Sequence, residues 1–316
     1  MQYRQLGQSG IEVSAVGMGC WVFSGDPAWG PQDDRDSIAS VHAALDAGIT
    51  LFDTAESYGN GRSEEVLGRA LEGRRDRAVI ATKVSEGHLA AGDVRASCEA
   101  SLRRLRTDVI DLYQIHWPNP EEQIEEGWGV IADLIKEGKV RYGGVSNFSV
   151  AQLRQIQPIH PVASLQPPYS MLGPGIEDDL LPYCAENDIG VIVYSPMQSG
   201  LLTGKYDRER IEGLPAGDWR RNSTQFTEPE LSANLSLIDR LRPIAARNDK
   251  TLPQLAIAWT LRRPDVTAAI AGARKPSQIE ETAQAADWEL SADDLEEIEA
   301  LLEERHQRID GKVDET

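Results

Sequence analysis

Residues 49–59 read Ile49-Thr50-Leu51-Phe52-Asp53-Thr54-Ala55-Glu56-Ser57-Tyr58-Gly59, an apolar run that passes into a polar turn. A short apolar run that is followed by turn residues predicts a buried strand. The strand would end at Asp53, and Tyr58 would lie in the loop beyond it. Loops at strand ends often carry functional side chains, so this segment is a candidate site.

Two later segments have the same form. The apolar run 78–82 is followed by Lys83, and the run 109–115 is followed by His116. The three strand ends together offer an acid with a tyrosine, a lysine and a histidine. This set suits proton transfer to a carbonyl oxygen, because a neighbouring cation favours the phenolate form of a tyrosine and an acid can pair with that cation. Tyr58 is the predicted proton donor, and the other three side chains assist it.

Helical patterns alternate with apolar runs over most of the chain. The predicted strands end at positions 19, 53, 83, 116, 146, 166, 194 and 270. A strand and a helix every ~30 residues is what parallel strands with crossover helices require, and eight such units close a (β/α)₈ TIM barrel. We therefore expect a single α/β domain over residues 1–316, with a small β-hairpin over residues 3–14 ahead of the barrel.

The interval between the last two strand ends, positions 194 and 270, is much longer than the others. It holds a segment with Gly, Pro and Asn, 200–227, and a helical pattern, 230–247. A connection of this length is expected to be a long loop after strand 7 that reaches over the site. The polar tail, 307–316, is expected to be loosely held.

Composition restricts the class of protein. The hydrophobic content of 41% allows a large core, and no apolar run is long enough to span a membrane. The N-terminus lacks the apolar core of a signal peptide, and the three cysteines are far apart. A cytoplasmic protein without a disulfide framework or a metal site is therefore expected. The net charge of -19 argues against nucleic acid and anionic membrane as partners, because both are polyanions.

The acidic composition has two interpretations. Lysine is scarce among the 32 basic residues, and an acidic, lysine-poor surface suits a halophilic host, in whose cytoplasm salt screens self-repulsion. The alternative is an ordinary acidic bacterial protein. Under either interpretation, a phosphorylated ligand must be met by a local group of basic residues.

Polar residues gather at the predicted strand ends, where the active sites of TIM barrels lie. Besides the four residues above, they are Ser146, Asn147, Gln166, Tyr194 and Ser195. The glycines in 16–21 suggest a dinucleotide-binding fingerprint, but the third glycine of that motif would fall at Val22. A Rossmann fold is therefore not expected.

Together these segments resemble the aldo-keto reductases, a family of NAD(P)H-dependent (β/α)₈ oxidoreductases. The resemblance rests on Asp53-Thr54-Ala55 with Tyr58-Gly59, on Lys83 and His116, and on three longer matches: Gly17-Met18-Gly19-Cys20-Trp21, the run 105–113, and Gly144-Val145-Ser146-Asn147-Phe148. It implies that the protein reduces aldehydes and ketones to alcohols by hydride transfer, with a small carbonyl compound as the substrate.

The resemblance also implies where the cofactor lies. It would extend across the barrel mouth, with Ser146, Asn147 and Gln166 at its carboxamide, Tyr194 stacked on its nicotinamide ring, and the segment 195–205 over its pyrophosphate. The implied cofactor contacts are Gly19, Trp21, Asp53, Ser146, Asn147, Gln166, Tyr194, Ser195, Met197, Ser199, Gly200, Leu201, Thr203, Lys205, Gly272, Arg274, Gln278, Glu281 and Thr282.

The segment after the last strand bears on the choice of cofactor. It carries Gly272-Ala273-Arg274, Gln278 and Glu281-Thr282 where many relatives have Lys-Ser, Arg and Glu-Asn. This departure resembles a bacterial subgroup in which the arginine next to glycine-alanine takes the adenosine phosphate. We therefore expect NADP(H) to be preferred over NAD(H), with Arg274 as the main reason.

Aromatic residues near the site are expected to form the substrate pocket. Trp21, Phe23 and Trp117, together with Tyr58, would enclose a carbonyl compound with an apolar body. Two alternatives to the reductase stay open: an NADP-binding regulatory module with slow turnover, and a lyase that uses Lys83 as a Schiff base. The sequence indicates no oligomeric state.

Overall fold

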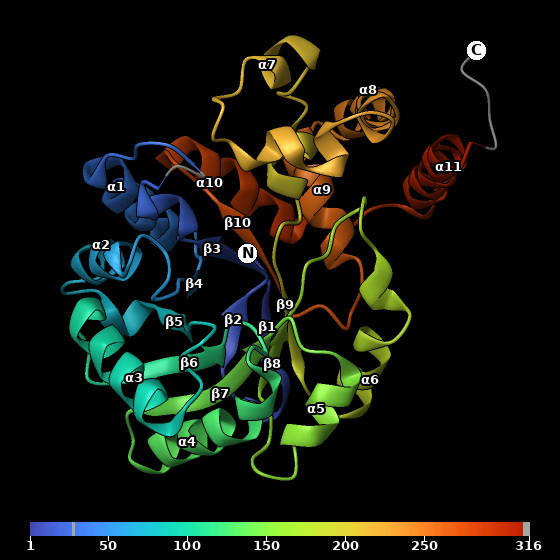
Figure 1. Ribbon diagram of the computed structural model, residues 1–316. Helices are drawn as coiled ribbons and strands as arrows, with labels where there is room; N and C mark the ends of the chain where they lie inside the picture. The colour runs from blue at the N-terminus through green and yellow to red at the C-terminus, as the bar shows by residue number, and fades with distance from the viewer. Residues whose placement is uncertain (27–28, 312–316) are drawn as a thin grey trace.

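Eight parallel strands close into a barrel in the computed structural model, which describes residues 1–26 and 29–311. Around the barrel the order is β10-β3-β4-β5-β6-β7-β8-β9 (Figure 1). The strands are β3 (Val16–Gly19), β4 (Leu51–Asp53), β5 (Val79–Val84), β6 (Ile110–Ile115), β7 (Val140–Ser146), β8 (Ser164–Gln166), β9 (Gly190–Val193) and β10 (Ala268–Gly272). The predicted (β/α)₈ fold is confirmed, and every strand ends within two residues of its predicted position.

The strands pair in parallel because a helix after each strand returns the chain to the opposite end of the barrel. The register places Gly19 beside Asp53 on one side and beside Gly272 on the other. Lys83 lies beside Gln114 of the next strand. The carboxyl ends of all eight strands therefore meet at one mouth, where the predicted site residues are collected.

The N-terminal hairpin lies at the other end of the barrel. Its strands β1 (Tyr3–Gln5) and β2 (Glu12–Ser14) pair antiparallel, as predicted. Leu6 is fully buried in the cluster that fills the barrel interior. Gly7 has a φ of +52°, and a Cβ there would lie 2.5 Å from the backbone nitrogen of Gly190, so the close approach requires glycine.

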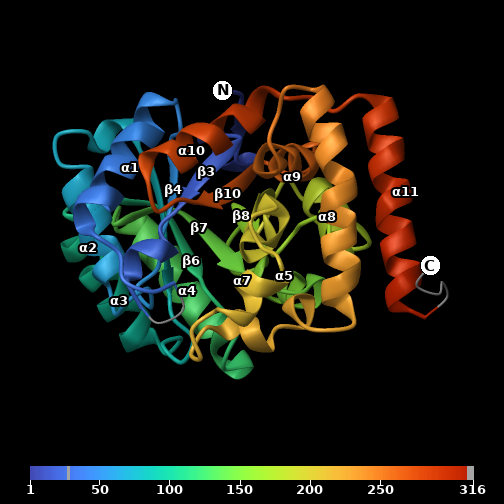
Figure 2. The ribbon, with the colours of Figure 1, turned by 90° about the horizontal axis from the view of Figure 1, so that it is seen from above.

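Helices surround the barrel (Figure 1). They are α1 (Asp34–Asp46), α2 (Arg62–Ala70), α3 (Ala91–Leu105), α4 (Ile124–Lys136), α5 (Val150–Ile156), α6 (Leu180–Glu186), α7 (Arg208–Glu212), α8 (Glu230–Arg247), α9 (Leu252–Leu261), α10 (Pro276–Ala283) and α11 (Ala292–Ile309). The long helices α8 and α11 lie side by side (Figure 2). Within the described ranges, no helix is long and apolar enough to cross a membrane.

Side-chain caps explain where several helices begin. Ser149 accepts a hydrogen bond from the Gln152 backbone at the start of α5, and Thr251 does the same for Gln254 at the start of α9. In both cases the side-chain oxygen of the glutamine accepts a hydrogen bond from the backbone nitrogen of the capping residue. The two bonds satisfy two backbone donors that the helix leaves open.

The long connection after β9 contains regular structure. It holds α7 and α8, with 3₁₀ turns at Gln198–Thr203, Trp219–Asn222 and Thr224–Phe226.

At the C-terminal end of the chain, α11 extends to Ile309, past the predicted beginning of a loose tail. Arg308 stabilises this last turn, because it donates to Ser236 on α8 at 3.1 Å and pairs with Glu304 at 2.6 Å. The remainder of the predicted tail, 312–316, lies outside the described residues.

The core has two parts. One cluster fills the barrel interior and includes Leu51, Leu112 and Ile192. A larger cluster lies between the strands and the surrounding helices. Because side chains alternate along a strand, neighbouring residues of β4 and β6 belong to different clusters: Leu51 and Leu112 to the inner one, Phe52 and Tyr113 to the outer one. The inner cluster supports the side chains at the mouth from below.

Candidate active site

A buried lysine is the centre of the polar group at the barrel mouth. Lys83 Nζ donates to Asp53 Oδ1 at 2.6 Å, to the carbonyl oxygen of Thr54 at 2.8 Å and to the Tyr58 hydroxyl at 3.4 Å. Gln166 Nε2 donates to the other carboxylate oxygen of Asp53 at 2.7 Å. Lys83 is 0% and Asp53 4% exposed, so the charged pair is desolvated. The structure thus brings the acid and the tyrosine of one predicted strand end together with the lysine of another.

The loop between β4 and α2 is tied to the barrel wall. Thr54 Oγ1 and Ser63 Oγ lie 2.8 Å apart, one at each end of this loop. The next residue, Glu64, is fully buried and accepts from Thr82 Oγ1 at 2.6 Å and from Arg104 Nε at 2.5 Å. These bonds join the loop to β5 at the position just before the lysine, which limits how far the loop can move.

Burial and charge set the protonation of the central pair. Burial raises the pKa of the Tyr58 hydroxyl above its usual value of 10, and the Lys83 cation offsets only part of this rise. Burial by itself would lower the pKa of Lys83, but Asp53 and Tyr58 outweigh it, so that pKa is raised. At neutral pH the lysine is therefore a cation and the tyrosine is protonated. The expected attraction of Lys83 for a phenolate is present, but it is smaller than the effect of burial.

His116 completes the predicted group. Its ring packs edge-on against the Tyr58 ring with centroids 5.7 Å apart, and its Nδ1 lies 3.4 Å from Ser57 Oγ. Burial, aided by the Lys83 charge, lowers the pKa of His116 from 6.5 to about 3. The imidazole is therefore neutral at physiological pH. It can donate a hydrogen bond, but it does not carry the extra proton that a general acid would transfer.

This lowered pKa predicts a pH effect on stability. Above its unfolded pKa of 6.5, His116 is neutral in both states. As the pH falls toward about 3, the unfolded chain binds a proton that the folded protein excludes, so the free energy of unfolding decreases. We expect His116→Gln to lose less stability than the wild type between about pH 7 and about pH 4 in denaturant titrations. Identical pH dependence in the two proteins would contradict the burial of a neutral imidazole.

Asn147 connects the ends of three strands. Its Nδ2 donates to the His116 carbonyl oxygen and to Ser146 Oγ, both at 3.0 Å, and its Oδ1 accepts from the Tyr194 hydroxyl at 2.9 Å. Ser146 Oγ donates to the carbonyl oxygen of Gln166 at 2.8 Å. The predicted carboxamide-binding and ring-stacking residues therefore form one connected network at the mouth.

The backbone after β9 turns sharply. Ser195 has a φ of 58°, and residues 198–200 have consecutive values of 46°, 54° and 94°. Successive backbone N–H groups in such turns create concavities that bind anions. Thr203 Oγ1 donates to the carbonyl oxygen of Gly200 at 2.6 Å, which holds the turn closed. Of the other residues predicted here, Leu201 is fully buried, Met197 half-buried and Lys205 exposed.

The segment after β10 holds the remaining predicted contacts. Gly272 is exposed at the strand end, and Gln278 Oε1 accepts from the Arg274 backbone nitrogen at 2.8 Å. Thr282 is buried, with its hydroxyl directed at the carbonyl oxygen of Gln278 in its own helix at 3.0 Å. Glu281 is half-buried. The Arg274 guanidinium binds the loop before α1, a contact that the sequence did not predict.

Two tryptophans form the open wall of the site. Trp21 is 39% exposed and stacks on Tyr58 with centroids 5.6 Å apart, and Trp117 is 43% exposed and stacks on His116 at 6.3 Å. The expected third wall residue is wrong: Phe23 is 0% exposed and belongs to the hydrophobic core. Both Trp21 and Phe23 lie in one 3₁₀ turn, where residues two apart point in different directions, so one faces the mouth and the other the interior.

The sequence also failed to indicate two residues of the mouth. The Trp29 ring meets the Trp21 ring edge-on, with centroids 5.4 Å apart. The Arg220 guanidinium lies 5.5 Å from the centroid of the Trp29 ring, so the loops after β3 and β9 touch. Gln32 Oε1 accepts from Arg274 Nε at 2.9 Å. Trp29 and Gln32 lie in a segment that is rich in Gly and Pro and has no periodicity. The signal that this segment did carry was Trp29 itself, a second tryptophan shortly after Trp21.

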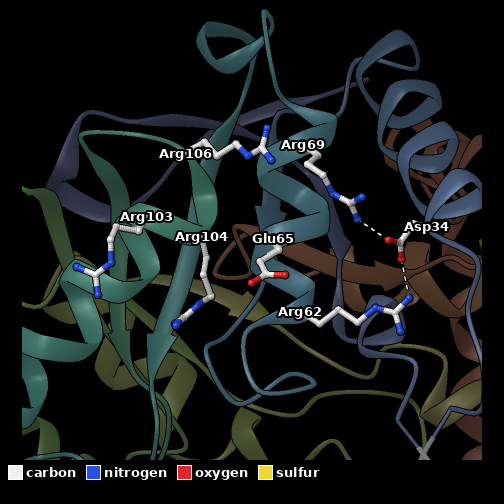
Figure 3. Close-up of a pocket in the computed structure, with 7 residues that line it drawn as sticks. All are labelled: Asp34, Arg62, Glu65, Arg69, Arg103, Arg104 and Arg106. Carbon is white, nitrogen blue, oxygen red and sulfur yellow. Dashed lines mark hydrogen bonds and ion pairs between the residues drawn. The ribbon is translucent and has the colours of Figure 1, made fainter.

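A separate hollow of about 610 Å³ lies on the outer side of α2. It is lined by Asp34, Arg62, Glu65, Arg69, Arg103, Arg104 and Arg106 (Figure 3). The arginines are largely neutralised by acids: Asp34 binds both Arg62 and Arg69, and further carboxylates pair with Arg104 and Arg106. We therefore interpret the hollow as a network of surface ion pairs.

No cluster of three or more His, Cys, Asp or Glu residues in 1–26 and 29–311 could hold a metal ion. Cys20 lies next to the site, but burial raises the pKa of its thiol well above the usual value, which suppresses the reactive thiolate.

Known proteins are similar to this chain in sequence and in fold. The sequence model of the Aldo/keto reductase family matches residues 15–303. Aldo-keto reductase YhdN of Bacillus subtilis is 39% identical over 96% of this chain and 94% of its own length. The structure of glycerol dehydrogenase AKR11B4 from Gluconobacter oxydans superposes with a TM-score of 0.88 at 34% identity, covering 99% of this chain and 98% of its own. An aldo-keto reductase from Klebsiella pneumoniae in complex with NADPH has a TM-score of 0.76 at 29% identity, covering 96% and 95%.

Proposed function

Since the chain belongs to the aldo/keto reductase family, we propose that it reduces aldehydes and ketones to alcohols with NADPH, and that Tyr58 is the proton donor. The observation that carries the proposal is the Lys83 ammonium, which is buried between the Asp53 carboxylate and the Tyr58 hydroxyl. Such a cation stabilises the phenolate that forms when the tyrosine gives up its proton.

Each side chain has a defined part in the reduction. When bound, NADPH supplies the hydride that reaches the carbonyl carbon. Tyr58 transfers its hydroxyl proton to the carbonyl oxygen, so the product is a neutral alcohol and the tyrosine is left as a phenolate. Lys83 balances this charge, and Asp53 holds the lysine in place. The neutral His116 orients the carbonyl oxygen by a hydrogen bond.

The donors at the mouth suit a dinucleotide phosphate. The turn 198–200 offers backbone N–H groups for a pyrophosphate, and Lys205 is an exposed cation close by. Arg274 offers a guanidinium beyond the end of β10. In the Klebsiella relative the bound cofactor is NADPH, and we propose the same preference here.

Two other functions fit the site less well. A Schiff-base lyase needs a neutral lysine amine with a free lone pair. The pKa of Lys83 is raised, and its Nζ donates three hydrogen bonds, which suits an ammonium ion without a lone pair. A regulatory module with slow turnover does not require the proton donor, the buried ion pair and the neutral histidine to lie together. The complete group therefore favours a working reductase.

The cofactor preference is testable through Arg274. We expect Arg274→Ala to weaken NADPH binding by ~10- to 150-fold and to change NADH binding little, because charge-assisted hydrogen bonds to the 2′-phosphate are worth ~1.5–3 kcal/mol. Titration of both cofactors at one fixed salt concentration measures this. Lys275→Ala is the matched control, since it removes the same charge from the exposed neighbouring position. Equal losses for NADPH and NADH in Arg274→Ala would show that the phosphate is bound elsewhere.

The remaining proposals concern the substrate and the host. The tryptophan wall supports a carbonyl compound with an apolar body. We further propose a cytoplasmic location, from the buried free cysteines, and adaptation to a saline interior, from the charge of -19. Neither proposal affects the chemistry at the barrel mouth.

A further inference from the structure

The Arg274 guanidinium is already held by the protein. Nε donates to Gln32 Oε1 at 2.9 Å, Nη1 donates to the Trp29 carbonyl oxygen at 2.8 Å, and Nη2 donates to the Pro31 carbonyl oxygen. The Arg274 backbone is held as well, because Gln32 Nε2 donates to its carbonyl oxygen at 3.0 Å. Among the described residues, Gln32 is thus the side chain that contacts both the backbone and the guanidinium of Arg274 through its own two polar atoms.

These contacts leave part of the guanidinium available. An arginine has five N–H donors, and the described residues Gln32, Trp29 and Pro31 accept from three of them, so these contacts leave one on each terminal nitrogen. Two donors on neighbouring nitrogens are what a phosphate needs for a bidentate contact. The loop can therefore hold the arginine and leave it able to bind a ligand.

Gln32 is itself held, through its backbone carbonyl. Arg62 Nη2 donates to the Gln32 carbonyl oxygen at 3.2 Å and to Asp34 Oδ1 at 2.6 Å. Asp34 also binds Arg69, so its carboxylate joins the two arginines (Figure 3). The bonds run from α2 through Gln32 to Arg274, and they keep the glutamine in place before any cofactor arrives.

We propose that Gln32 is a positioning residue that sets the preference for NADPH by holding Arg274 in the orientation that receives the 2′-phosphate. An arginine side chain loses rotamer freedom when it binds a ligand, and holding it in advance removes part of that cost. This inference rests on the proposed function, because it requires Arg274 to bind the cofactor phosphate.

The test uses Gln32→Leu, which keeps the size of the side chain and removes both hydrogen bonds to Arg274. Gln32 is only partly buried, so the variant should fold. We expect NADPH to bind about two- to twelvefold more weakly, the range given by ~0.5–1.5 kcal/mol for one immobilised side chain. NADH binding and kcat at saturating NADPH should not change.

A double-variant cycle separates positioning from a structural role. In the Arg274→Ala background, Gln32→Leu should have no further effect on the ratio of the NADPH and NADH dissociation constants. An effect that persists in that background, or that falls equally on both cofactors, would overturn the inference. If Arg274→Ala is selective and Gln32→Leu is not, the inference alone fails. If Arg274→Ala is itself unselective, the proposed phosphate contact fails with it.

Discussion

Tyr58→Phe should lower kcat by ~10²- to 10⁴-fold, the contribution expected of a general acid in the transition state. Phenylalanine keeps the ring that stacks on Trp21 and that lies 5.1 Å from Lys83 Nζ, and it loses only the hydroxyl. The dissociation constant for NADPH should therefore stay close to that of the wild type. Steady-state rates with an aldehyde substrate and a cofactor titration give the two numbers.

The matched control for this variant is Tyr3→Phe. Tyr3 is 45% exposed in the N-terminal hairpin, where its hydroxyl donates to the Gly48 carbonyl oxygen at 3.0 Å. Its loss should leave kcat unchanged. Because burial raises the pKa of Tyr58 above 10, the wild-type rate should also persist into alkaline solution before the donor is lost. A Tyr58→Phe enzyme with the wild-type rate would show that another group gives the proton.

Lys83→Met should destabilise the fold by ~3–5 kcal/mol, because it leaves the buried Asp53 carboxylate without its cation. Turnover should fall at the same time by at least ~10²-fold, since the phenolate of Tyr58 loses the charge that stabilises it. Denaturant unfolding measures the first effect, and NADPH oxidation measures the second.

The double variant Asp53→Leu with Lys83→Met distinguishes the two effects. It removes both charges, so much of the stability should return while activity stays low. If Lys83→Met alone were as stable as the wild type, the pair would not be the desolvated ion pair described above. Borohydride treatment of the wild type with substrate should leave Lys83 unmodified, because a protonated amine forms no Schiff base. A trapped adduct on Lys83 would favour the lyase.

The barrel could be predicted from the sequence because the residue patterns that determine it are periodic. Apolar runs recur at regular intervals, and the polar residues that follow them, such as Asp53, Lys83 and Gln166, must meet at one mouth once the strands are parallel. The hairpin was predictable for a similar reason, since two short alternating runs flank a turn with glycine. These features follow from local patterns together with one rule of topology.

The features that could not be predicted from the sequence depend on side-chain direction and burial. Phe23 faces the core because it lies in a 3₁₀ turn, and nothing in the residue types sets that direction. The balance at Tyr58 between burial and the Lys83 charge requires a solvent-excluded environment that a linear pattern cannot supply. Gln32 binds a residue 242 positions away, and its loop has no periodicity to mark it.

The central claim is that this barrel mouth reduces a carbonyl group by hydride transfer, and isotope transfer tests it most directly. NADPH deuterated at both C4 positions is incubated with the protein and an apolar aldehyde, and the product is analysed by mass spectrometry. The account predicts an alcohol with deuterium on the former carbonyl carbon, in an amount equal to the NADPH oxidised. NADPH that binds but is not oxidised with any of a set of aldehydes and ketones, or an alcohol without deuterium, would contradict it.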